Sequence, residues 1–174
     1  MTARGAASPD KPLESDPHDF ARAIVLRQLT MAPRSRHQLL EKLRVKGCDD
    51  DVSRVVLDRM QEVGLVDDEA YAGMVIRSGQ TSRGLARRAL SQELRRKGVD
   101  DDIVQGALEQ IDDESERDRA RALVLKKMRS LHGLDAVVQT RRLAGMLARK
   151  GYSSSMSWSV IKEAVADAPE HQRD

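Results

Sequence analysis

The sequence contains very little of several residue types on which common folds and sites depend. One cysteine, Cys48, excludes an internal disulfide and any multi-cysteine zinc or iron–sulfur site. The aromatic residues Phe20, Tyr71, Tyr152 and Trp158 are too few for an ordinary β-sandwich core or for stacking single-stranded bases. No apolar run is long enough to span a membrane, and the first residues lack the hydrophobic stretch of a secretory signal. We therefore expect a cytoplasmic protein.

Sequence motifs for catalysis are also missing. There is no GxxxxGK[ST] phosphate loop, no GxGxxG turn after a strand, and no HExxH or cysteine-rich metal spacing. The four histidines are scattered along the chain and show no ligand spacing. We expect a protein that is not an enzyme and that uses neither a cofactor nor a metal ion.

One ten-residue pattern occurs three times in the chain. LRVKGCDDDV begins at Leu43, LRRKGVDDDI begins at Leu94, and the weaker copy LARKGYSSSM begins at Leu147. Each copy begins with a leucine four residues before its glycine, and another leucine stands four residues earlier in the chain, which is the spacing of one helical face. The glycine suits the left-handed residue that closes a helix. The three closing glycines are Gly47, Gly98 and Gly151.

The residues after each glycine are typical of a helix start. They read DDD from Asp49 and from Asp100, and SSS from Ser153. Both Asp and Ser accept hydrogen bonds from the free amides of a first helical turn. Three adjacent carboxylates could instead bind a divalent cation. Because the third copy keeps the capping ability and loses the charge, we interpret these runs as helix caps.

The helix that ends at each glycine and the helix that begins after it form a pair. A further helix precedes each pair, beginning near Phe20, Tyr71 and Arg117. Ser35 with Gln38 forms a capping-box pattern at the start of one middle helix. The sequence therefore predicts an all-α protein of three tandem three-helix repeats in an elongated, modular array whose neighbours share a core. The predicted limits are a disordered tail at 1–17, repeats at 18–64, 65–112 and 113–167, and a second disordered tail at 168–174.

The middle helix of each predicted repeat is strongly basic. Lysines directly before the glycines are explained by the helix dipole, but arginines near the helix starts gain nothing from it. We expect an exposed stripe of guanidinium groups that binds carboxylates or phosphates of a partner. The alternative is an ordinary solvated face. The candidate partner- or DNA-binding residues are Arg34, Arg36, Arg44, Arg83, Arg87, Arg88, Arg95, Arg96, Arg141, Arg142 and Arg149.

Three longer segments resemble the RecX family of bacterial recombinase regulators. They are RSRHQLLEKLRVKG from Arg34, VGLVDDEAYA from Val63 and RGLARRALSQELRRKGV from Arg83, and the resemblance covers about residues 20–166. It implies a non-enzymatic inhibitor that binds the RecA filament on single-stranded DNA. Such a protein reduces ATPase, strand-exchange and co-protease activity in homologous recombination, DNA repair and the SOS response. The chain departs from the family pattern at Gln38, where Glu is common, and at the SSS of the third repeat.

Two functions from different classes are compatible with the sequence. The first is modulation of the RecA filament, with weak and non-specific binding to single- or double-stranded DNA. The alternative is a direct DNA-binding, helix-turn-helix-like protein or transcriptional regulator, although no set of base-reading residues is identifiable. We expect a monomer in either case. We also expect Arg87 and Arg88 to be exposed, so that replacing both with alanine leaves thermal melting nearly unchanged.

Overall fold

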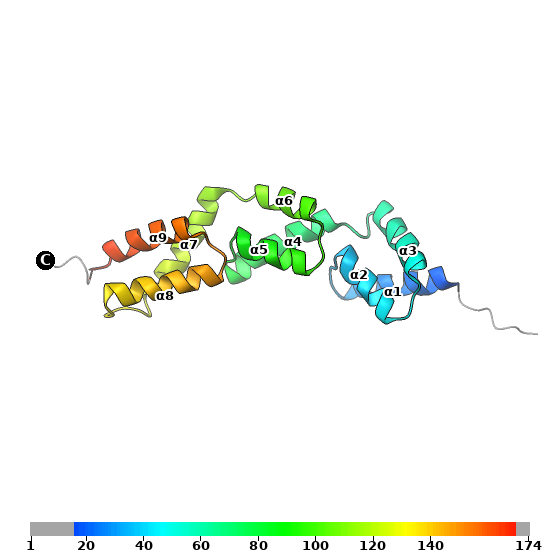
Figure 1. Ribbon diagram of the computed structural model, residues 1–174, viewed down its shortest axis with the longest axis horizontal. Helices are drawn as coiled ribbons and strands as arrows, with labels where there is room; N and C mark the ends of the chain where they lie inside the picture. The colour runs from blue at the N-terminus through cyan, green and yellow to red at the C-terminus, as the bar shows by residue number, and fades with distance from the viewer. Residues whose placement is uncertain (1–15, 170–174) are drawn as a thin grey trace, which may run out of the picture. The chain divides into compact units, whose positions relative to one another are not determined.

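A computed structural model describes residues 16–169, and this part of the chain forms nine α-helices and no strand (Figure 1). The all-α prediction of three tandem three-helix repeats is therefore confirmed. Both predicted disordered tails lie largely outside the described residues. None of the nine helices has the length and apolar character needed to cross a bilayer. The helices are α1 (Pro17–Met31), α2 (Arg36–Val45), α3 (Asp50–Glu62), α4 (Asp68–Arg83), α5 (Arg87–Arg96), α6 (Asp101–Glu109), α7 (Asp113–Met128), α8 (Ala136–Arg149) and α9 (Ser154–Ala166).

The described residues divide into two compact units. Unit 1 comprises 16–34 and 39–66, and contains α1, most of α2, and α3. Unit 2 comprises 35–38 and 67–169, and contains the first turn of α2 together with α4 to α9. Repeat 2 (α4–α6) and repeat 3 (α7–α9) thus belong to one unit, from which the surfaces described below are built.

The repeated sequence pattern starts and ends its helices as predicted. The N-caps of α3, α6 and α9, whose side chains accept hydrogen bonds from first-turn amides, are Asp49, Asp100 and Ser153. The closing glycines adopt left-handed φ values of 79° at Gly47, 73° at Gly98 and 87° at Gly151. The capping interpretation of the acidic runs is confirmed. Between residues 16 and 169, no group of three or more His, Cys, Asp or Glu side chains could hold a metal ion.

The predicted capping box at the start of α2 is present. The amide of Ser35 donates to Oε1 of Gln38 at 3.1 Å, and the amide of Gln38 donates to Oγ of Ser35 at 3.2 Å. Within unit 2, the Arg36 amide also donates to Oδ1 of Asp68 at 2.8 Å. Burial raises the pKa of Asp68, and the hydrogen bond from Arg36 opposes that shift. A carboxylate outside the helix therefore adds to the local cap.

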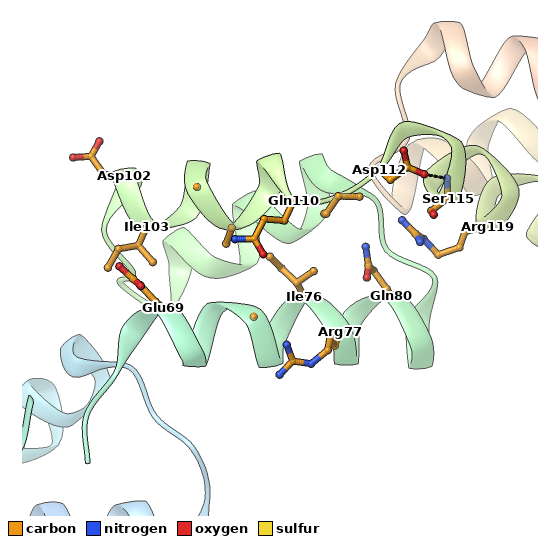
Figure 2. Close-up of a pocket in the computed structure, with 14 residues that line it drawn as sticks. Glu69, Ile76, Arg77, Gln80, Asp102, Ile103, Gln110, Asp112, Ser115 and Arg119 are labelled. Carbon is orange, nitrogen blue, oxygen red and sulfur yellow. Dashed lines mark hydrogen bonds between the residues drawn. The ribbon is translucent and has the colours of Figure 1, made fainter. Parts of the chain in front are cut away.

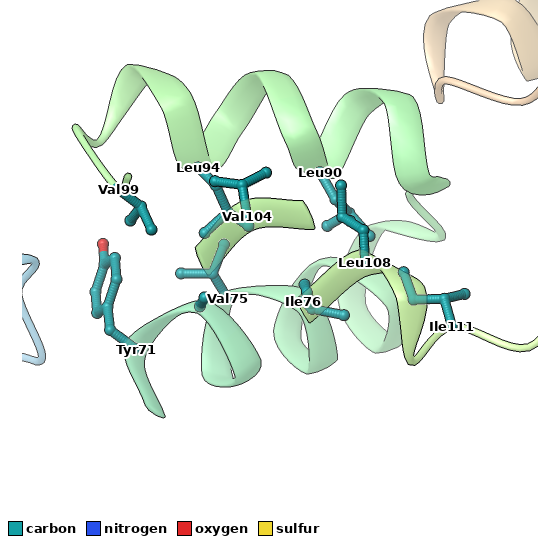
Figure 3. Packing of buried hydrophobic residues seen from close by; sticks show 10 residues of the cluster. Tyr71, Val75, Ile76, Leu90, Leu94, Val99, Val104, Leu108 and Ile111 are labelled. Atoms are coloured by element: carbon teal, nitrogen blue, oxygen red, sulfur yellow. The ribbon is translucent and has the colours of Figure 1, made fainter. Parts of the chain in front are cut away.

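Each repeat has its own apolar core. The leucine pairs of the repeated pattern are at most 1% exposed, and side chains from α4, α5 and α6 meet around the pair of repeat 2 (Figure 3). The buried apolar residues form three separate clusters, one per repeat, and Ala86 alone among buried residues of repeat 2 joins the cluster of repeat 3. The expectation that neighbours share a core was therefore wrong. Repeats 2 and 3 meet through hydrogen bonds, through Ala86 and through the close approach of Ala89 to Gly151.

Candidate functional site

Repeats 2 and 3 are joined by hydrogen bonds around the start of α5. The Ala86 amide donates to the carbonyl oxygen of Lys150 at 2.9 Å, and the Tyr152 hydroxyl donates to the carbonyl oxygen of Gly84 at 3.0 Å. Burial raises the pKa of Tyr152, and the nearby charge of Arg119 opposes that shift. These contacts hold the first turn of α5 against the end of α8.

Arg87 is part of this junction. Its amide donates to Oε1 of Glu116 at 2.8 Å, and its Nη1 lies 3.5 Å from Oε2 of the same carboxylate. Its guanidinium also donates to the Asp113 carboxylate and to the carbonyl oxygen of Ile111. The residue before the helix, Ala86, has no side-chain acceptor. Glu116 of α7 therefore supplies the cap that the local sequence lacks.

The expectation that Arg87 and Arg88 both occupy exposed positions is thus correct for Arg88 and wrong for Arg87. The Arg87 side chain is only 35% exposed and is ion-paired, because α7 brings two carboxylates to the start of α5. Arg88 is exposed and has no ion-pair partner within the described range 16–169. Adjacent arginines therefore have different roles: one joins two repeats and the other faces solvent.

Arg44 and Arg95 occupy the same position, three residues before the closing glycine, and make the same ion pair. Nε of Arg44 lies 2.9 Å from Oδ1 of Asp50, and Nε of Arg95 lies 2.8 Å from Oδ1 of Asp101. The hydrogen bonds from Arg44 hold the pKa of Asp50 below its usual value. In repeat 3, alanine and serine replace both members of the pair. Loss of both partners together indicates that these arginines stabilise their repeats.

Three other predicted arginines near the ends of helices have distinct surroundings. Nη2 of Arg83 lies 2.8 Å from Oε2 of Glu93. Nε of Arg34 is buried and has no hydrogen-bond partner among residues 16–169, and the Arg36 backbone contributes to the cap at Asp68.

The remaining predicted arginines are exposed and lack ion-pair partners within residues 16–169. Arg88 and Arg96 of α5 stand ten and two residues before Gly98, and Arg141 and Arg149 of α8 stand at the same two positions before their glycine. We call these four side chains the repeated arginine pairs. Each arginine lies two residues from a buried leucine, on the opposite side of its helix.

The structure corrects the expected location of the α8 arginines. Because α8 begins at Ala136, Arg141 and Arg142 lie in the middle of the helix and not near its start. Repeat 1 differs again, since His37 and Val45 occupy the two positions of the arginine pair. The repeated arginine pairs are therefore confined to repeats 2 and 3. Comparing residues at equal distances from the closing glycine would have found this pattern in the sequence.

Arg88 also lines a shallow depression between α5 and α6. The depression has a volume of about 530 Å³, and Ser91, Gln105 and Glu109 contribute to its lining. A guanidinium group beside hydroxyl and amide side chains can bind a carboxylate or phosphate in two-point geometry. The lining therefore combines guanidinium groups with hydroxyl and amide side chains and with one carboxylate, Glu109.

Comparisons with known proteins identify the same three repeats. The family model described as RecX, first three-helix domain, matches residues 21–60, the second domain matches 67–108, and the third matches 114–161. Regulatory protein RecX of Streptomyces coelicolor is 48% identical over 155 residues, covering 89% of this chain and 82% of that protein. Regulatory protein RecX of Mycolicibacterium smegmatis is 42% identical over 180 residues, covering 99% and 96%. Both relatives are named as regulators.

Solved structures show the same fold. The crystal structure of RecX from Lactobacillus salivarius has a TM-score of 0.79 and 21% sequence identity, with 86% of this chain and 97% of that chain covered. A second crystal structure of regulatory protein RecX has a TM-score of 0.75 and 25% identity, with 86% and 73% covered. The three domain matches and the long, similar relatives lead to one conclusion: this chain belongs to the RecX family.

Proposed function

We propose that this chain is a non-enzymatic inhibitor of the RecA recombinase in the cytoplasm. It binds the RecA nucleoprotein filament as a monomer and reduces its ATPase, strand-exchange and co-protease activities. It thereby limits homologous recombination, DNA repair and the SOS response. Membership of a family of regulators supports this proposal. The observation that carries it is the repeated arginine pairs, which are exposed on α5 and α8 and are not needed for ion pairs within the described chain.

The arginine pairs suit a partner with repeated anionic groups. The two members of each pair are eight residues apart, which is about 12 Å along a helix. The same spacing occurs in two consecutive repeats. A recombinase filament on DNA likewise has repeated subunits and regularly spaced phosphates. Because these guanidinium groups are exposed, their attraction to a partner should weaken as salt increases.

Titration of the full chain into RecA hydrolysing ATP on single-stranded DNA tests the proposal. We expect progressive suppression of hydrolysis by the wild-type chain. The double variant Arg88→Ala with Arg96→Ala should require about tenfold more protein for equal suppression, which corresponds to a loss of about 1.4 kcal/mol when both exposed charges are removed. The control, Arg27→Ala with Lys162→Ala, removes two exposed charges from other helices and should inhibit like the wild type. Unchanged hydrolysis across the wild-type titration would contradict the proposal.

Direct binding to DNA is the competing function, because exposed guanidinium groups also attract phosphates. Gel-shift titrations of duplex DNA without RecA, at two salt concentrations, separate the two functions. Our proposal predicts weak and uniform binding that is lost at the higher salt. Tight binding that discriminates between sequences would instead support a transcriptional regulator.

A further inference from the structure

A separate groove in repeat 2 lies between α4 and α6 and extends to the start of α7 (Figure 2). It has a volume of about 610 Å³, and its apolar lining includes Ile76, Ile103 and Ala107. A glycine stands on each of the two facing helices, Gly73 on α4 and Gly106 on α6. A Cβ atom at Gly106 would meet no heavy atom within 4 Å, so the groove is open at that point.

One end of this groove is acidic. Glu69 and Asp102 lie in the first turns of α4 and α6, and Figure 2 shows both at the same end because the two helices run in the same direction. Neither carboxylate has an ion-pair partner within 16–169, the range that the structure describes. Their positions favour the helix dipoles, which explains the residue type but leaves both charges available to a ligand.

The rest of the groove carries two guanidinium groups. Arg77 reaches back along its helix, so that a Cβ atom at Gly73 would lie 3.2 Å from its Nη1. Arg119 of α7 lies at the end opposite the acidic pair, and its guanidinium is partly buried and interacts with Tyr152 (Figure 2). Asp112 at this end accepts a hydrogen bond from the Ser115 amide at 2.8 Å and caps α7.

We infer that this groove binds a polypeptide segment of the recombinase, an inference that rests on the proposed function. The segment would place apolar side chains on the floor, a cationic residue beside Glu69 and Asp102, and a carboxylate beside Arg77. Arg77 is exposed and has no ion-pair partner within residues 16–169, so a carboxylate from the partner would form a charge-assisted hydrogen bond with it.

The dimensions of the groove are consistent with such a segment. From Asp102 to Gln110, α6 rises roughly 12 Å, which matches about two helical turns or about four extended residues of a bound chain. Glycine on both walls lets the backbone of the bound segment come close. The opposite charges along the groove would determine the direction of the segment, and the apolar floor would contribute affinity that salt does not screen.

Filling the groove tests this inference. RecA filaments are assembled on an immobilised single-stranded oligonucleotide with a non-hydrolysable ATP analogue, and binding of the full chain is measured by interferometry. Gly106→Trp should weaken binding about tenfold or more, while Gly106→Ala should stay within about twofold of the wild type. Ala122→Trp, on the exposed side of α7, adds the same ring outside the groove and should bind like the wild type.

A second variant tests the groove by changing its charge and not by filling it with a larger side chain. Arg77→Glu reverses one charge of the groove and should weaken binding about tenfold, whereas Arg27→Glu on α1 makes the same change outside the groove and should have no such effect. If the wild-type chain fails to bind the filament, the proposed function is wrong. If the wild-type chain, Gly106→Trp and Arg77→Glu all bind equally well, the groove inference is wrong and the proposed function is unaffected.

Discussion

The two adjacent arginines at the start of α5 should respond differently to the same substitution. Arg87→Ala removes a guanidinium that contacts Glu116, Asp113 and a backbone carbonyl. Arg88→Ala removes an exposed side chain that has no ion-pair partner in the described chain, residues 16–169. Because the residues are neighbours on one helix, each variant serves as the control for the other.

The burial of Glu116 sets the size of the Arg87 effect. Its side chain is only 8% exposed, so loss of Arg87 leaves a nearly buried carboxylate that still accepts from the backbone amide of residue 87 but has lost its ion pair. Breaking a fully buried pair costs about 3–5 kcal/mol, but Arg87 itself is 35% exposed, so we expect a loss of about 2 kcal/mol in unfolding free energy. For Arg88→Ala we expect a change below about 0.5 kcal/mol.

Urea unfolding followed by circular dichroism measures both changes. Hydrogen–deuterium exchange of peptides from α5 then shows whether the lost protection lies in unit 2. In a Glu116→Gln background, the effect of Arg87→Ala should shrink, since no buried charge is left unpaired. If Arg87→Ala and Arg88→Ala both remain within about 0.5 kcal/mol of the wild type, the junction does not depend on Arg87 and our reasoning is refuted.

Two further predictions concern other contacts of the repeats. Gly151→Ala should lower the free energy of unfolding by about 3 kcal/mol, because the residue has a φ of 87° and its new Cβ atom would lie 2.4 Å from the Ala89 amide nitrogen. Gly47→Ala has a similar φ but no heavy atom near the new Cβ atom, so it should lower the free energy of unfolding by only about 1–2 kcal/mol. Equal losses in urea unfolding would show that the close approach is unimportant. Glu163→Gln should destabilise the fold at neutral pH, because hydrogen bonds from Arg121 hold the pKa of Glu163 below its ordinary value in the folded state. This contribution is present above the ordinary glutamate pKa and is lost as pH falls toward the folded pKa. The urea midpoints of the wild type and Glu163→Gln should therefore converge in acid, and a difference that persists there would contradict this assignment.

Local signals allowed most of the fold to be predicted from the sequence. A capping side chain acts on amides two or three residues away, and a closing glycine acts on its own φ, so both are visible in a short segment. The four-residue spacing of Leu90 and Leu94 predicts that both lie on one face of a helix, and both side chains are fully buried. The same logic identified the cap formed by Ser35 and Gln38.

The roles of the arginines could not be assigned in the same way. The partner of Arg87 is Glu116, 29 residues away on another repeat, and helical periodicity indicates which face is buried but not which neighbour covers it. The pair between Arg44 and Asp50 spans only six residues and recurs in repeat 2, so comparison of the repeats could have revealed it. Separate cores were missed because periodicity does not show which cluster a buried face joins.

Repeat 2 presents two surfaces that would respond differently to salt. Its arginine pair, Arg88 and Arg96, lies on exposed α5, where charges separated from a partner by more than about 10 Å are largely screened at 0.1 M salt. The groove between α4 and α6 has an apolar floor, whose burial does not weaken as ionic strength rises. If both surfaces contact the recombinase, the arginine variant should bind with a reduced salt dependence, whereas Gly106→Trp should bind more weakly at every salt concentration. Salt titration of these two variants therefore separates electrostatic attraction to the filament from specific docking.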